Sequence, residues 1–423
     1  MATIIKDLPE LVEHNIISPQ TAADIEKYYA TKAQPQNNSM LTIFGALGGI
    51  LAGLGIILIF AHNWDAFSKT VKTGLAVLPL FMAQVLAGYS IFKNKSSVWK
   101  ETSATLMFFA VGASISLVAQ IYNISGDFPA FLMTWILLCL PLVYLLKSNA
   151  AAILLLVFST WYSVAGGYFI TDQPYMYLLF IAALLPFYSE HLKVNANSNM
   201  AFILNWLLPL SAIIALGAFI NGNDSFMLAI YMAFFGLLYA IGAAPYFANL
   251  KRRTGYLALG ESGIIIVLLI FSNRPMWTEV AGVAANTSYI VFWIALLLLT
   301  AVIMLRYKNA TFNAGITAAI FCFPILYFIA KTSVPIATIL TNLLVLAISV
   351  ITIRNGIKRL NFRTLNFGLV VVAALTTFRF FDTNISFAIR GSLFLIVGIG
   401  FFVTNLIVVK RKKDTPNNFT HEN

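Results

Sequence analysis

Long apolar stretches, each close to the length of a membrane span, divide almost the whole chain. A helix of about 20 apolar residues crosses the hydrocarbon core of a bilayer, which is about 30 Å thick. About fourteen such stretches cover 40–61, 70–92, 103–122, 129–146, 150–170, 174–189, 200–220, 225–247, 255–272, 281–305, 310–330, 334–353, 364–380 and 387–409. The chain is therefore predicted to fold as an all-α, polytopic bundle of transmembrane helices.

The basic residues fall mainly into every second gap between these stretches. When the amino terminus is placed inside, 21 of the 27 Lys and Arg residues lie on the inner side. This asymmetry is the positive-inside pattern of multi-pass membrane proteins. The pattern also supports the shortest stretch, 174–189, as a true span. If this stretch did not cross the membrane, every later gap would change sides, which would leave 11 basic residues inside and 16 outside. An even number of spans with both termini in the cytoplasm is favoured, and twelve is the nearest alternative to fourteen.

The composition excludes an ordinary soluble domain, in which about a quarter of the residues are charged. Here 60% of the residues are hydrophobic and 10% are charged. The net charge of +11 resides in short inner loops and a basic tail, so it indicates attraction to anionic lipid rather than nucleic-acid binding. Cys139 and Cys322 fall inside spans and the four histidines are scattered, so no disulfide framework, metal site or cofactor is predicted. The sequence also contains no catalytic motif of a known enzyme class.

Three regions are expected along the chain. They are a cytoplasmic helical hairpin with its linker at 1–39, a transmembrane domain at 40–409, and a cytoplasmic tail at 410–423 that is basic at first and disordered after Lys413. In the hairpin, apolar residues between Leu8 and Ile17 predict a short amphipathic helix. Ser18 and Pro19 predict the start of a second helix, because serine is favoured as an N-cap and proline in the first helical position. The hairpin either packs on the inner loops, lies on the bilayer surface or binds a cytoplasmic partner.

The first span is rich in glycine at a regular spacing. Gly45, Gly49 and Gly53 are four residues apart and therefore share one face of a helix. Small residues at this spacing allow a neighbouring helix to approach closely. We expect that neighbour to come from the same chain, with a second protomer as the alternative.

Three groups of polar residues map to the outer ends of the spans. The groups are His62, Asp65 and Lys69; Gln120, Asn123 and Asp127; and Arg379, Asp382 and Arg390. Their basic residues lie on the side that the positive-inside rule disfavours, so we expect the aspartates to compensate them. The first and third groups are expected to meet. The ion pairs either only hold the ends of helical hairpins together or form a ligand or ion site.

Glu261 lies about seven residues into the span at 255–272. A carboxylate there is roughly 10 Å from the inner end of the helix, at about 1.5 Å per residue. It needs either a partner or a proton at that depth. One interpretation is a proton-coupling residue in a transport path, and the other is an interfacial carboxylate close to Lys251, Arg252 and Arg253.

Two parts of the chain resemble a known family. The stretches LVEHNIISPQTAADIEKYY, IFAHNWD and VGASISLVAQIYNISGDF are similar to the amino-terminal region of bacterial membrane proteins with domain of unknown function 2157. The carboxyl-terminal stretch LNFGLVVVAALTTFRFFD resembles longer members of the same family. The resemblance implies a multi-pass bacterial membrane protein and assigns no role to individual residues.

Two functions are therefore carried forward. The first is a transporter-like protein of the bacterial cytoplasmic membrane that handles a small molecule or a lipid-linked precursor, because the chain combines many spans with buried polar residues. The second is an accessory or sensory protein that recruits a cytoplasmic partner through residues 1–39. A continuous polar path from the three outer groups to Glu261 would favour the first function, whereas a sealed bundle with an exposed hydrophobic groove on residues 1–39 would favour the second.

Overall fold

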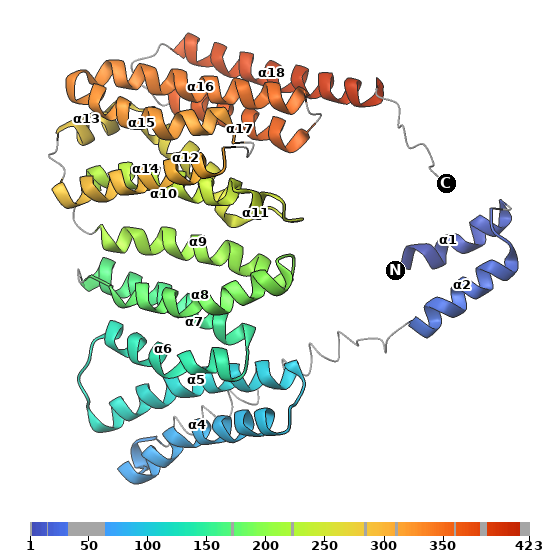
Figure 1. Ribbon diagram of the computed structural model, residues 1–423, viewed down its shortest axis with the longest axis vertical. Coiled ribbons are helices and arrows are strands. Elements are labelled where there is room, and N and C mark those ends of the chain that lie inside the picture. Colours follow the sequence, from blue (N-terminus) through green and yellow to red (C-terminus); the bar gives the residue numbers. More distant parts are fainter. Residues whose placement is uncertain are drawn as a thin grey trace. The chain divides into compact units, whose positions relative to one another are not determined.

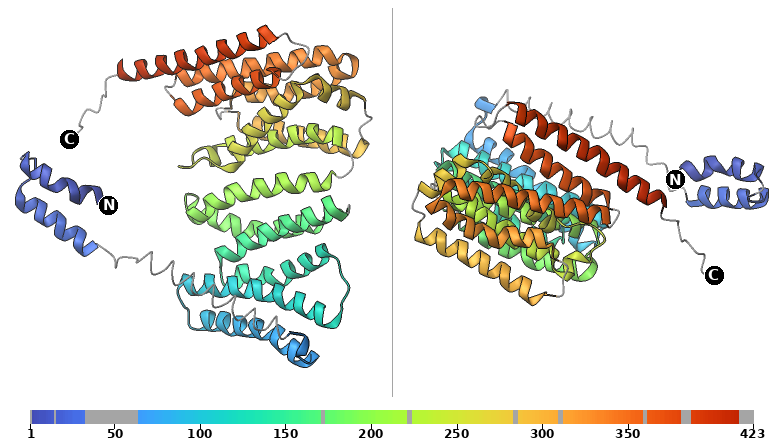
Figure 2. Two further views of the ribbon diagram at one scale, coloured as in Figure 1. Left: turned by 180° about the vertical axis from the view of Figure 1, so that it is seen from behind. Right: turned by 90° about the horizontal axis from the view of Figure 1, so that it is seen from above.

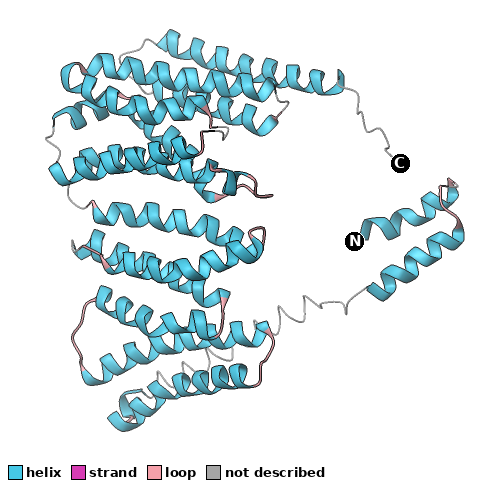
Figure 3. Cartoon of the chain, viewed as in Figure 1, coloured by secondary structure: helices cyan, strands magenta, loops and turns pink. Residues whose placement is uncertain are grey.

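The computed structural model describes most of the chain as helix. The described residues are 2–14, 16–32, 64–170, 173–220, 224–282, 286–308, 312–358, 361–380 and 387–414, and none of them forms a strand (Figure 3). The chain divides into two units, Met1–Leu75 and Ala76–Asn423. The predicted all-α fold is confirmed over the described residues.

The first unit contains the predicted helical hairpin. Helix α1 (Ala2–Glu13) is followed by α2 (Pro19–Lys32), and Leu8 of α1 is buried. Ser18 begins α2 as predicted, because its hydroxyl accepts a hydrogen bond from the backbone N–H of Thr21 at 3.1 Å. The 3₁₀ turn η1 (Trp64–Ala66) and the first turns of α4 (Lys69–Phe92) complete the described part of this unit. Gly45, Gly49 and Gly53 lie outside the described residues, so the close helix approach at these glycines stays a prediction.

The second unit is an array of helices that lie side by side (Figures 1 and 2). Beyond α4 it comprises α5 (Ser97–Tyr122), α6 (Phe128–Leu145), α7 (Asn149–Val164), the π-helix η2 (Ala165–Ile170), α8 (Met176–Asn195), α9 (Asn199–Phe219), α10 (Asp224–Ala243), α11 (Pro245–Ala248), α12 (Gly255–Phe271), α13 (Arg274–Gly282), α14 (Thr287–Arg306), α15 (Ala314–Thr332), α16 (Val334–Lys358), α17 (Phe362–Phe380) and α18 (Phe387–Asp414). The helices follow one another in chain order from α4 to α10, after which both α12 and α14 pack against α10.

Nine helices in the described part are long and apolar enough to cross a membrane. They are α4, α5, α6, the joined α7 and η2, α9, α10, α14, α15 and α16. The predicted spans 174–189, 364–380 and 387–409 correspond to α8, α17 and α18. All three are helical, but α8 is not among the nine, and α17 and α18 contain shorter apolar helices. The predicted first span, 40–61, lies outside the described residues.

Loops at one end of the second unit are joined by hydrogen bonds. The hydroxyl of Tyr246 donates to the carbonyl of Leu192 at 3.0 Å, and the backbone N–H of Lys251 donates to Oδ1 of Asn197 at 2.9 Å. We call this end, which carries Lys193 and the loop 249–254, the basic end. Helices α8 and α10 end there, whereas α9 and α12 begin there.

Glycines bring α10 and α12 into close contact. A Cβ atom at Gly260 would lie 2.5 Å from the backbone nitrogen of Tyr239, and one at Gly263 would lie 2.2 Å from Cδ1 of Phe235. No side chain fits at these separations, so the two backbones approach as helices do at small-residue interfaces in membranes. Tyr239 itself is buried, and the core around it extends to α14 and α15.

Helix α12 ends at Phe271, within one residue of the end predicted for the span 255–272, but a second helix, α13, begins after only two residues. After Phe271 the chain bends by 88° into α13, so the two helices form either one broken span or a re-entrant loop. The fully buried Trp277 of α13 donates its indole N–H to Oγ1 of Thr341 at 3.2 Å. The polar sequence RPMWTEVAG therefore forms a helix that inserts its tryptophan into the core, which the prediction of a plain connection missed.

Candidate functional site

The first predicted polar group lies at the start of α4. Lys69 is exposed, and Nζ of the nearby Lys72 lies 5.7 Å from the ring centroid of Trp64. A cation above an aromatic face is stabilised by the quadrupole of the ring. His62 and the side chain of Asp65 are not among the described features, so their pairing remains a prediction.

The second predicted group forms the junction between α5 and α6. Asn123 ends α5 in the left-handed conformation with φ 50°, which asparagine tolerates better than most residues. Asp127 accepts a hydrogen bond from the backbone N–H of Ala130 at 2.6 Å and thereby caps α6. Gln120 is exposed in the last turn of α5. The geometry of this group is that of two helix caps.

The third predicted group falls mostly outside the described side chains. Arg379 lies in the last turn of α17 and Arg390 in the first turn of α18, whereas Asp382 belongs to the segment between them that is not described. The expected contact between the first and third groups depends on Asp65 and Asp382. It stays a prediction.

One further basic residue on the predicted outer side is compensated by backbone carbonyls. Nζ of Lys331, in the last turn of α15, donates to the carbonyl of Ala281 at 2.9 Å and lies 3.4 Å from that of Val280. These carbonyls end α13, where the helix dipole attracts a cation. The ring of Tyr327 lies 5.5 Å from the same ammonium group. This arrangement was not foreseen, because α13 itself was not predicted.

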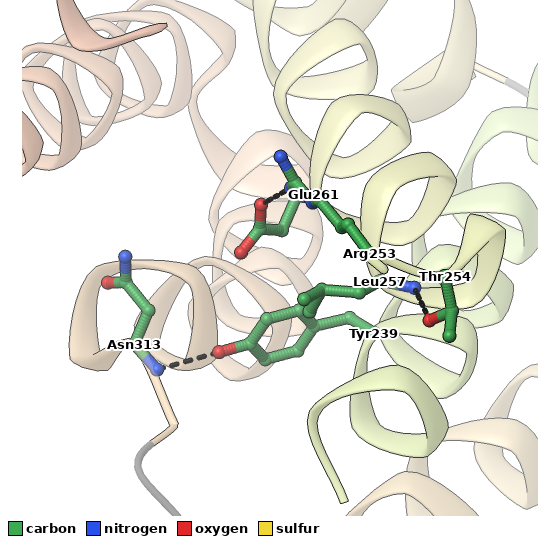
Figure 4. A network of polar contacts seen from close by, with 6 residues as sticks. All are labelled: Tyr239, Arg253, Thr254, Leu257, Glu261 and Asn313. Atoms are coloured by element: carbon green, nitrogen blue, oxygen red, sulfur yellow. Dashed lines mark hydrogen bonds and ion pairs between the residues drawn. The ribbon is translucent and has the colours of Figure 1, made fainter. Parts of the chain in front are cut away.

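Glu261 forms an ion pair with Arg253 at the basic end. The two side chains are in direct contact, Glu261 retains 20% of its exposure and Arg253 retains 51% (Figure 4). Among the described residues this is the one salt bridge. Arg253 thus supplies the counter-charge that a carboxylate at this depth requires.

The surroundings of this pair are fixed by backbone contacts. The hydroxyl of Tyr239 accepts a hydrogen bond from the backbone N–H of Asn313 at 2.6 Å, and Thr254 caps α12 through the N–H of Leu257 (Figure 4). Trp206 donates its indole N–H to the carbonyl of Arg253 at 3.2 Å. The loop that carries Arg253 is therefore held from both sides, and Glu261 is a half-buried anchor for it.

An apolar cavity of about 400 Å³ lies between α8, α9, α10 and α14. It is lined by aromatic and aliphatic side chains: Tyr177, Leu178, Ala212, Ala215, Leu216, Phe219, Ile220, Phe234, Tyr289 and Phe292. Tyr177 begins α8, Phe219 ends α9 and Tyr289 begins α14, so the cavity lies towards the end opposite the basic end. Its volume falls in the range of small-molecule pockets, about 300–1,000 Å³.

The polar atoms behind this cavity bond to one another. Oγ of Ser211 lies 2.9 Å from the hydroxyl of Tyr177 and 2.6 Å from that of Thr160, which also donates to the carbonyl of Leu156. The chain of hydroxyl groups links α7, α8 and α9 and leaves an apolar wall towards the cavity. The cavity is thus suited to a hydrocarbon chain rather than to a polar solute.

This cavity could not be predicted from the sequence, because the residues that line it share no motif. The only local signal is the pair of small residues Ala212 and Ala215 on α9, at a spacing that places them on one face. In the described part of the chain, His, Cys, Asp and Glu side chains form no group of three that could hold a metal ion.

One comparison with known proteins gives a match. Residues 9–152 match the model of a family described as predicted membrane protein (DUF2157). The resemblance of the amino-terminal region is thereby confirmed. The DUF2157 match runs from α1 into α7 and does not extend to the carboxyl-terminal stretch, whose resemblance stays a prediction. No curated protein and no solved structure matches the chain.

The DUF2157 region and the candidate sites overlap only in part. The region includes Lys69, Gln120, Asn123 and Asp127. Glu261 and the apolar cavity lie beyond it, in a part of the chain for which the family match implies nothing. Any function of the cavity therefore rests on its geometry.

Proposed function

We propose that this membrane protein is transporter-like and binds the hydrocarbon chain of a lipid or lipid-linked precursor in the apolar cavity between α8, α9, α10 and α14. The observation that carries the proposal is a cavity of about 400 Å³ with aromatic and aliphatic walls. Three of the four helices that form it, α9, α10 and α14, are long and apolar enough to cross a membrane, where hydrocarbon is the surrounding solvent.

The polar groups near the cavity favour a lipid over a polar small molecule. Tyr177, Ser211 and Thr160 bond to one another, so a polar solute would find few groups to replace its bound water. An acyl or isoprenoid chain needs no such partner, because in the membrane it passes from one apolar environment to another and binds by packing against the aromatic and aliphatic walls. The small-molecule interpretation is therefore the weaker of the two.

The proposal is tested with a lipid that carries a photoreactive group in its hydrocarbon chain. After irradiation of the protein in bilayers, digestion and mass spectrometry should locate the label on α9 and α14, at residues such as Phe219 and Phe292. Labels spread evenly over exposed residues such as Leu298 and Val302 would contradict a specific site. Transfer of a fluorescent lipid across vesicles that contain the protein tests the transport step.

The orientation proposed for the protein follows its charge pattern. We place it in a bacterial cytoplasmic membrane with both termini and the basic end in the cytoplasm, because 21 of its 27 basic residues then lie inside. The cavity would then face the outer leaflet.

An accessory role that recruits a cytoplasmic partner is the second candidate. The observation that favours it is the helical hairpin of α1 and α2, which belongs to the first unit, Met1–Leu75. Deletion of residues 2–32 distinguishes the two candidate functions. A carrier should retain lipid labelling without the hairpin, whereas an accessory protein should lose its cellular activity.

A further inference from the structure

A second cavity, of about 280 Å³, lies at the basic end between α6 and α8. It is lined by Lys147, in the loop after α6, and by Glu190 and His191, in the last turns of α8. Val143 and Phe187 form an apolar floor. The cavity is separate from the apolar cavity described above, and no residue lines both.

The two opposite charges in this cavity are not paired with each other. Lys147 and Glu190 are both exposed, and no described residue forms a salt bridge with either of them. Two opposite charges that line one cavity without meeting leave room for a ligand that carries both signs. A purely anionic ligand would be attracted by Lys147 and repelled by Glu190.

The position of Lys147 is imposed by its neighbours. Its backbone has φ 49°, a left-handed conformation that a lysine rarely adopts. Leu146 and Ser148 on either side are fully buried, and Ser148 caps α7. The lysine is thus held at the rim of the cavity by two fixed residues.

The opposite wall is held as firmly. One ring nitrogen of His191 lies 3.0 Å from the carbonyl of Phe187, and the other lies 3.0 Å from Oδ1 of Asn149 at the start of α7. The hydroxyl of Tyr144 donates to the carbonyl of Ala183 and ties α6 to α8. The cavity therefore keeps its shape without a ligand.

The level of the cavity along the helices indicates where such a ligand comes from. Lys147 follows α6, an apolar span of 18 residues, by two positions. The head groups of phospholipids lie at this level, next to the ends of the spans. Leu145, Leu185 and Val194 are exposed apolar residues around the cavity, against which acyl chains can pack.

We infer that this cavity binds the head group of a zwitterionic phospholipid of the phosphoethanolamine type. Lys147 contacts the phosphate, and the carboxylate of Glu190 accepts hydrogen bonds from the primary ammonium group. His191 positions the wall on which the head group rests. This inference is independent of the proposed function, because it uses other residues at the other end of the helices.

The test measures lipid retained by the full-length protein in detergent micelles, by native mass spectrometry. Phosphatidylethanolamine is compared with phosphatidylglycerol, which has the phosphate but no ammonium group. The unaltered protein should retain the first lipid preferentially. Glu190→Gln should lower retention of phosphatidylethanolamine about fivefold, equivalent to about 1 kcal/mol for one exposed ionic contact, and leave phosphatidylglycerol unchanged or raised.

Two further variants complete the test. Lys147→Gln should lower the retention of both lipids. Lys193 is exposed at the same helix end but lies outside the cavity, so Lys193→Gln should leave the retention of both lipids unchanged. If Lys147→Gln does not fold, Glu190→Gln alone decides, because Glu190 is exposed and its substitution disturbs no ion pair of the described part. Equal retention of the two lipids, or no effect of Glu190→Gln, would overturn the inference. Soluble O-phosphoethanolamine binding as tightly as the lipid would overturn the lipid assignment.

Discussion

The carboxylate of Glu101 on α5 accepts a hydrogen bond from the backbone N–H of Asn149, the first residue of α7, at 2.9 Å. It also accepts the N–H of Ala150 at 2.9 Å and the hydroxyl of the buried Ser148. The first N–H groups of a helix have no partner within the helix, and a negative charge is favoured there by the helix dipole. One side chain thus joins the start of α5 to the start of α7.

Glu101→Ala should therefore lower the stability of the protein. It leaves two backbone donors and a buried hydroxyl without their acceptor, at a cost of about 1–3 kcal/mol. Thermal unfolding in detergent checks this, and a clear fall in the midpoint temperature is expected. Glu279→Ala, which removes an exposed carboxylate of α13, is the control and should leave the midpoint unchanged. Equal midpoints for both variants would contradict the capping role.

Gly260→Ala should weaken the contact between α10 and α12. Its new Cβ would lie 2.5 Å from the backbone nitrogen of Tyr239, so the helices must separate. We expect the free energy of unfolding to fall by about 1–3 kcal/mol, as for other overpacked cores. Gly88→Ala in α4 meets no atom within 4 Å and serves as the control; it should be neutral or slightly stabilising, by up to about 1 kcal/mol. A tolerated Gly260→Ala would show that the two backbones do not approach so closely.

Arg253 and Glu261 should be energetically coupled. Arg253→Gln leaves the half-buried carboxylate of Glu261 without its counter-charge, whereas Glu261→Gln leaves an exposed guanidinium that water solvates. We expect Arg253→Gln to lower the unfolding midpoint more than Glu261→Gln does. The double variant should recover part of the midpoint that Arg253→Gln loses. A double-mutant cycle of unfolding midpoints measures this coupling. If Glu261→Gln instead abolishes a proton-linked activity at unchanged stability, Glu261 serves proton coupling and not the anchoring of the loop.

The topology predicts which sites a membrane-impermeant thiol reagent can reach in intact cells. Single cysteines at 127, 224 and 382 should be labelled, and those at 252 and 358 should be labelled only after the membrane is opened. Cys139 and Cys322 are replaced by alanine beforehand, so that each signal comes from one position. Labelling of position 252 or 358 from outside would show that the orientation is the opposite of the predicted one. The apolar cavity would then lie in the inner leaflet.

The helices could be predicted from the sequence because each apolar run has the length of a span. The prediction of a helix at 310–330 agrees with α15, Ala314–Thr332, and the capping role of Ser18 follows from local chemistry alone. The sharp bend before α13 could not be predicted. Arg274 and Glu279 give this segment the composition of a loop, and its helix is held by Trp277, whose partner Thr341 is 64 positions away.

The sites were harder to predict than the helices for a related reason. A cavity depends on which side chains remain small where several helices meet, and Ala212 faces Tyr177 and Phe292 only in the folded chain. Glu101 could not be recognised as a cap from the sequence, because its partners, the N–H groups of Asn149 and Ala150, are 48 and 49 positions away. Of the predicted site residues, Glu261 and Asp127 have described partners, Arg253 and the N-terminus of α6 respectively.

Ala212→Trp tests the central claim most directly. The new indole fills the cavity between α8, α9, α10 and α14, whereas Leu210→Trp places the same group on an exposed position of the same helix. The quantity measured is the yield of cross-linking to a lipid with a photoreactive hydrocarbon chain, for folded protein of each variant in identical bilayers. A specific chain-binding cavity predicts a loss of most of the cross-links on α9 and α14 in Ala212→Trp and an unchanged yield in Leu210→Trp. Equal yields in the two variants would contradict it.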